Sequence, residues 1–75
     1  MVYKKLTITI IRNFHNNRHR EVMLANNEKI VDIDIYDNDT MADVYTVSEN
    51  HIFYRYTYFL IDGKINYHNF KTAMF

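Results

Sequence analysis

Two stretches of the chain alternate between apolar and polar residues, a pattern that is typical of half-buried β-strands. The first stretch is residues 2–12, where Leu6 is one of the apolar positions. The second is residues 29–37, where the alternation is cleanest. In the second stretch we expect these side chains to point inward: Val31, Ile33 and Ile35. Residues 41–48 could form a short strand or a helical turn, but their Val, Tyr and Thr residues favour strand. The pattern therefore predicts strands at all three places.

The strongest local signal lies at Asp62-Gly63, which two aromatic and β-branched runs flank. An Asp-Gly pair between such runs is typical of a two-residue hairpin turn, because both turn residues must adopt positive φ. It predicts strands over about 51–61 and 64–71, paired in the register that a two-residue turn imposes.

Turn signals recur along the chain near positions 16, 26, 38, 49 and 62. Such regular spacing predicts an all-β domain over residues 1–75, a five- to six-stranded antiparallel meander curled into a small barrel or half-barrel. The alternative is an α+β fold with one short helix at about 20–28, where Met, Leu, Ala and Glu are good helix formers.

Both faces of the predicted hairpin are apolar, which is unusual for an antiparallel sheet. One face carries Tyr54, Tyr56 and Tyr58, and we assign it to the core. The opposite face carries the candidate protein-binding residues Phe53, Arg55, Phe59, Ile61, His68 and Phe70. Phe and Arg are enriched in protein interfaces, and the remaining chain is too short to cover both faces. We therefore expect this face to bind a protein and to form a symmetric homodimer.

Charges are segregated along a chain whose net charge is zero. Residues 1–20 carry five cations and no acid, whereas residues 21–49 carry eight acids and one cation. The candidate acidic face consists of Asp32, Asp34, Asp37, Asp39 and Asp43. A solvated surface is one interpretation of such a run. The functional interpretation is a surface that imitates nucleic-acid phosphates.

The basic N-terminal region suggests an alternative function, the binding of single-stranded nucleic acid. Its candidate residues are Arg12, Phe14, Arg18 and Arg20. The arginines would hold phosphates while a base stacks on the aromatic ring. The zero net charge argues against this alternative, because nucleic-acid-binding domains are usually basic.

Candidate chemistry is sparse. The chain has one glycine and no cysteine, which excludes glycine-rich phosphate loops, disulfides and thiolate metal sites. His15 and His19 are expected at the surface rather than in a zinc site, because a turn at Asn16-Asn17 would remove the helical meaning of their spacing. The acidic run fails the calcium-loop pattern. We expect no catalysis, no metal and no cofactor; a small His/Arg nuclease or toxin is the remaining enzymatic alternative.

The expected function is that of a small protein-binding module in the cytoplasm, with no membrane association and a partner that the sequence does not identify. Asn, Ile, Lys and Tyr make up 30 of the 75 residues, and their codons are AT-rich. Small proteins of this composition are common in phages and mobile elements. The sequence therefore favours a phage- or mobile-element-encoded inhibitor of a host nuclease or defence protein, of the anti-CRISPR or nucleic-acid-mimic kind, acting in the host cytoplasm.

Overall fold

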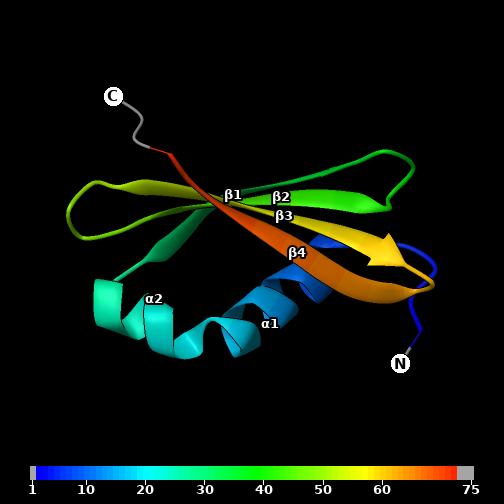
Figure 1. Ribbon diagram of the computed structural model, residues 1–75, viewed down its shortest axis with the longest axis horizontal. Helices are drawn as coiled ribbons and strands as arrows, with labels where there is room; N and C mark the ends of the chain where they lie inside the picture. The colour runs from blue at the N-terminus through cyan, green and yellow to red at the C-terminus, as the bar shows by residue number, and fades with distance from the viewer. Residues whose placement is uncertain (1, 73–75) are drawn as a thin grey trace.

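The computed structural model describes the backbone of residues 2–72 and the side chains of residues 2–68. Two helices, α1 (Ile8–Arg18) and α2 (Arg20–Asn26), come first. The strands follow as β1 (Lys29–Tyr36), β2 (Met41–Val47), β3 (Phe53–Ile61) and β4 (Lys64–Thr72). They form one antiparallel sheet in the order β1-β2-β3-β4. Both helices lie on the same side of this sheet (Figure 1).

The architecture is therefore mixed α+β, and the predicted all-β barrel or half-barrel is wrong. The sheet stays open, because β1 and β4 are its two edges and do not pair with each other. A helical layer covers one face of the tyrosine-rich strands, so closure of the sheet is not needed to bury that face.

Helix α1 occupies the segment in which the alternation of residues 2–12 predicted a strand. The Thr7 side chain caps the helix by accepting a hydrogen bond from the Ile10 amide at 3.2 Å. Within the helix, Ile11 and His15 are buried and Phe14 is half-buried, which is a helical spacing rather than a strand spacing. The turn predicted at residues 16 and 17 is also wrong, since both lie inside α1.

Helix α2 confirms the alternative prediction of a short helix within residues 20–28. It ends where Asn27 adopts the left-handed conformation, with φ at 50°. The amide of Glu28 then donates to the Met23 carbonyl at 2.8 Å. Asparagine tolerates this conformation, so the predicted turn near residue 26 is confirmed.

The sheet itself agrees with the sequence. Strand β1 falls where alternation predicted it, and β2 falls where the Val, Tyr and Thr residues favoured a strand. The β3–β4 hairpin has the predicted register from Ile61 opposite Lys64 outward. Val31 is the exception, because the register shifts between Ile30 and Asp32. This irregularity leaves Val31 53% exposed instead of inward-facing.

The core lies between the helices and the sheet. Its buried apolar residues are Leu6, Ile11, Ala42, Val44, Tyr56 and Tyr58. The N-terminal segment closes one end of this layer, because the Tyr3 amide donates to the Gly63 carbonyl and the Leu6 amide donates to the Asp39 carbonyl. Within the described residues, neither helix is long and apolar enough to cross a membrane.

Candidate functional site

The face of the sheet opposite the helices has none of the described elements packed on it (Figure 1). We call it the open face. Cross-strand partners point to the same side of a sheet, so the observed pairing assigns its members. Its described side chains are Lys29, Asp32, Asp34, Tyr36, Met41, Asp43, Tyr45, Val47, Phe53, Arg55, Thr57, Phe59, Ile61, Lys64, Asn66 and His68.

The open face brings together two sets of residues that the sequence treated as separate sites. It holds the aromatic set Phe53, Arg55, Phe59, Ile61 and His68. It also holds Asp32, Asp34 and Asp43 of the acidic set. Two other acids of that set, Asp37 and Asp39, lie in the β1–β2 turn, where both have positive φ. The side chain of Phe70 lies outside the described residues.

Asp43 organises the centre of the open face. Its carboxylate accepts hydrogen bonds from Thr57 at 2.8 Å, Tyr36 at 3.1 Å and Tyr45 at 3.4 Å. Burial and the hydrogen bond to Asp43 raise the pKa of Tyr36. Asp34 lies directly opposite Asp43 on the neighbouring strand. Like charges in that position repel each other. The hydroxyl groups around Asp43 offset this repulsion by donating hydrogen bonds to its carboxylate.

A hollow of about 440 Å³ marks the acidic side of the open face. It is lined by Val31, Asp32, Asp34, Tyr45 and Phe53. Carboxylates and aromatic rings therefore border the same depression. On the aromatic side, the rings of Phe59 and His68 stack with centroids 5.0 Å apart.

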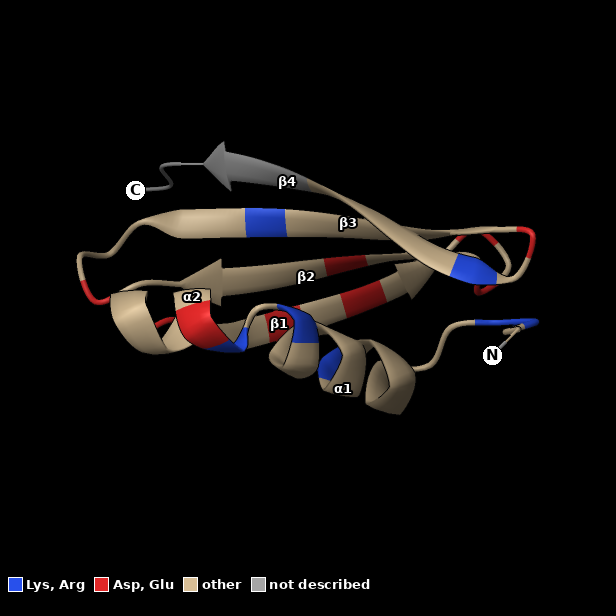
Figure 2. Ribbon diagram, turned by 60° about the horizontal axis from the view of Figure 1, so that its bottom comes forward, with Lys and Arg blue, Asp and Glu red and all other residues tan. Residues whose placement is uncertain are grey.

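Charge is divided between the two halves of the open face. All the acidic residues of this face lie on β1 and β2, whereas two of its three cations lie on β3 and at the start of β4 (Figure 2). The acids are Asp32, Asp34 and Asp43; the cations are Arg55 and Lys64, together with Lys29 at the start of β1. The open face thus has an acidic half and a basic half.

The covered face contains a buried polar cluster that the sequence did not reveal. His15 is 0% exposed and His19 is 8% exposed, so the prediction of surface histidines is wrong. His15 Nδ1 and the Tyr58 hydroxyl are hydrogen-bonded at 2.6 Å. The His15 ring also meets the Tyr56 ring edge-on, with centroids 4.6 Å apart. Because Asn16-Asn17 is helical, the spacing of four places both histidines on the face of the helices that meets the sheet.

Burial sets the protonation of this cluster. It lowers the pKa of His15 to about 4, and the nearby His19 acts in the same direction. Burial and then the charge of Arg18 lower the pKa of His19, against the opposing effect of Glu28. Glu28 is itself buried and accepts from the hydroxyls of Thr46 at 2.7 Å and Tyr56 at 3.4 Å. The cluster therefore joins helix to sheet with neutral imidazoles.

The residues of the nucleic-acid alternative lie on the helical side, away from the open face. Arg12, Arg18 and Arg20 are exposed, and the Arg18 guanidinium lies 5.8 Å from the Tyr67 ring centroid. Phe14 instead packs edge-on against Tyr58, with centroids 5.7 Å apart. The ring expected to stack on a base is thus part of the packing between helix and sheet.

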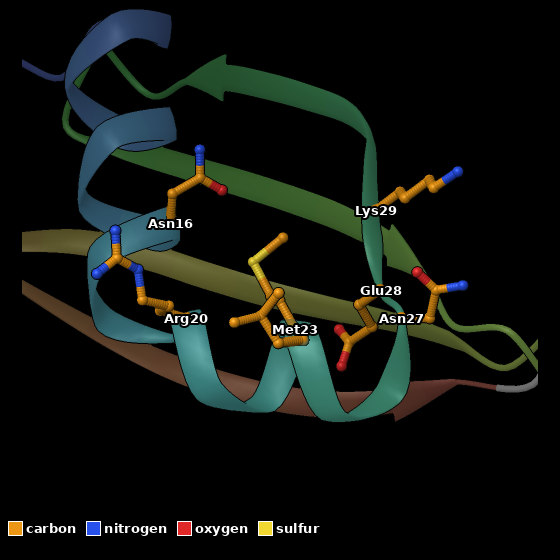
Figure 3. Close-up of a pocket in the computed structure, with 7 residues that line it drawn as sticks. Asn16, Arg20, Met23, Asn27, Glu28 and Lys29 are labelled. Atoms are coloured by element: carbon orange, nitrogen blue, oxygen red, sulfur yellow. The ribbon is translucent and has the colours of Figure 1, made fainter.

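A groove of about 340 Å³ lies beside α2 and the start of β1 (Figure 3). Its polar lining comes from Asn16, Arg20, Asn27, Glu28 and Lys29, with Met23 and Leu24 supplying the apolar part. The lining offers no nucleophile paired with a base, and Glu28 is engaged by Thr46.

In the part of the chain that the structure describes, no three His, Cys, Asp or Glu residues are grouped so that they could hold a metal ion. Comparisons with protein-family models, curated proteins and solved structures found no match to this chain. The function must therefore be inferred from the geometry of the two faces.

Proposed function

We propose that this chain is a small non-catalytic module that binds another protein through the open face. The hollow on the acidic half carries the proposal, because Asp32 and Asp34 border it together with Tyr45 and Phe53. An arginine side chain suits such a site, since a carboxylate pairs with its guanidinium while an aromatic ring stacks on its plane. The partner is therefore a protein with a basic surface.

The repulsion within the acidic half supports the same partner. Asp34 and Asp43 face each other across neighbouring strands. A bound cation would relieve that repulsion. Binding would therefore remove an unfavourable electrostatic free energy that the unbound chain carries. Asp32 and Asp34 are two residues apart on one strand, about 6.8 Å, which is close to the spacing of successive phosphates along a strand of nucleic acid. An acidic surface of this kind would compete with nucleic acid for its binding protein.

The absence of catalysis is part of the proposal. The closest histidine–hydroxyl contact that we describe joins His15 and Tyr58, and it lies in the core, where His15 is 0% exposed. On the open face, Thr57 donates to Asp43 and the His68 ring stacks on Phe59. Thr57 is half-buried and shares the Asp43 carboxylate with Tyr36 and Tyr45, so this contact does not offer a free base to a substrate.

The biological role that we propose is inhibition of a nuclease or defence protein in the cytoplasm of the host of a phage or mobile element. It is supported by the acidic half of the open face and by a composition that favours AT-rich codons. Nothing in this role requires a cofactor.

A pulldown that compares two matched variants tests the proposal. Phe59→Asp places a charge on the open face, and Leu24→Asp makes the same kind of change on α2, where Leu24 is 77% exposed. A true partner is retained by the wild type and by Leu24→Asp but lost with Phe59→Asp, and its purified complex weakens steeply with salt. Equal retention by both variants, or loss only with Leu24→Asp, would place the binding surface elsewhere.

A further inference from the structure

We propose that the open face also binds a second copy of this chain, in a face-to-face homodimer whose two-fold axis runs parallel to the strands. This inference rests on the proposed function, because it assigns a partner to the same face. The homodimer is the more specific of the two proposals, since the orientation of both copies is defined.

The division of charge selects this axis. A two-fold axis parallel to the strands and between the sheets brings β1 of one copy opposite β4 of the other. Strands β1 and β2, which carry the acids, then lie opposite β3 and β4, which carry Arg55 and Lys64. An axis perpendicular to the strands in the same plane would place β1 opposite β1, and the acids would repel. Figure 2 shows the asymmetry, with acids on β1 and β2 and cations on β3 and β4.

The register identifies which residues would face each other. Asp34, Asp43, Thr57 and His68 form one row across the four strands. Rotation about an axis parallel to the strands reverses this row and keeps its height, so Asp34 lies opposite His68 of the second copy. In the neighbouring row, Tyr45 and Arg55 are paired across β2 and β3. The same rotation places Tyr45 opposite Arg55 of the second copy, a suitable cation–π pair.

The size of the open face is sufficient for a weak dimer. Four strands are about 19 Å wide, and strands of seven to nine residues are about 24–30 Å long. The two sheets together would bury about 1,000 Å², the lower limit for a specific interface. We therefore expect a dissociation constant in the micromolar range.

Pairing through the β1 edge is less suitable. The register of β1 shifts between Ile30 and Asp32, and the strand carries Asp32 and Asp34. Bulges and charges of this kind prevent edge strands from pairing with another chain. The open face is thus the better surface for a second copy.

Two single variants and their mixture test the orientation by sedimentation equilibrium between about 1 and 300 μM, a range that brackets a micromolar dissociation constant. Asp34→Lys would face the basic half of the second copy, and His68→Asp would face its acidic half. Each variant alone should weaken the dimer at least tenfold. Mixed in equal amounts, they should form a heterodimer within about threefold of wild-type affinity. In that heterodimer the introduced lysine meets the introduced aspartate, while the unchanged His68 of one copy meets the unchanged Asp34 of the other.

Glu21→Lys is the matched control, since Glu21 is exposed on α2 and the charge change is of the same kind. It should leave the wild-type dimer unchanged, and circular dichroism should show that every variant is folded. A wild type that remains monomeric at about 300 μM overturns the homodimer, as does a mixture that stays monomeric. Protein binding that depends on the open face in the pulldown would then still support the proposed function, so the two failures are distinguishable.

Discussion

The covered face and the open face are built from alternate residues of the same strands, yet their side chains differ in exposure and in hydrogen-bond partners. On β3, Tyr56 and Tyr58 are 2% and 0% exposed, whereas Ile61 on the other face is 53% exposed. The hydroxyls of the covered face bond to His15 and Glu28 and hold the helical layer in place. The hydroxyls of the open face converge on Asp43, a carboxylate near solvent. The polar groups of the covered face therefore hold the helices to the sheet, whereas those of the open face surround a carboxylate near solvent.

The largest expected effect comes from removing a ring of the covered face. Tyr58→Ala should destabilise the protein by about 3–5 kcal/mol, because it leaves a cavity and deprives His15 of its hydrogen-bond partner. Phe59→Ala, the next residue but on the open face, should cost only about 1 kcal/mol, since Phe59 is half-buried. Urea denaturation of both variants measures the difference. Equal losses would mean that the two faces contribute equally to the core.

Acid should selectively loosen the covered face. The pKa of His15 is lowered to about 4 in the fold, against an ordinary value of 6.5 in the unfolded chain. Between these values the unfolded chain binds more protons, so stability is complete above about pH 7 and falls as the pH drops toward 4. The loss from His15 should reach at most about 3 kcal/mol.

The groups around His15 set the size of this effect. His19 is 4.6 Å away between ring centroids and should add to the loss, because its pKa is also lowered. Glu28 opposes it by favouring the charged form of His19. The variant His15→Asn should show a shallower loss of stability between pH 7 and pH 4 in urea titrations. An unchanged slope would show that His15 is not buried in its neutral form.

The β3–β4 turn offers a smaller but sharper perturbation at the end of the covered face. Gly63 has φ at +75°, and a side chain there would collide with Val2 and approach the Tyr3 carbonyl oxygen at 3.2 Å. Gly63→Val should therefore cost about 1–3 kcal/mol. Asp62→Asn is the control, since Asp62 has φ at 50° and asparagine tolerates that region. Thermal unfolding compares them, and matching midpoints would argue against this close approach.

The hairpin could be predicted from sequence because its information is local. Asp62-Gly63 fixes the turn, the turn fixes the register, and the register assigns Tyr56 and Tyr58 to one face and Phe59 to the other. The helices could not be predicted in the same way. The alternation of Ile8 and Ile10 favoured a strand. The segment is helical instead, because the helical spacing of Ile11 and His15 allows both side chains to cover the tyrosine face. Tertiary packing here overrides local preference.

The candidate site was predicted in pieces. The sequence identified Asp34 and Phe59 as members of different surfaces, because their common location depends on the pairing of β1 with β2 and of β2 with β3. The irregularity beside Val31 left no signal in the pattern. The spacing of His15 and His19 did contain a signal, which would have indicated a shared helical face had Asn16-Asn17 not suggested a turn.

Thiol labelling of two single-cysteine variants asks whether the open face is the binding surface. The chain has no native cysteine, so Ile61→Cys reports on the open face and Leu24→Cys on the helical side. Both positions are well exposed and should label quickly at about 1 μM, below a micromolar dissociation constant. At about 300 μM, or with a purified partner, we expect labelling of the Ile61→Cys variant to slow at least fivefold while the Leu24→Cys variant is unaffected. Protection of the Leu24→Cys variant alone, or unchanged labelling of the Ile61→Cys variant when a complex demonstrably forms, would contradict a binding role for the open face.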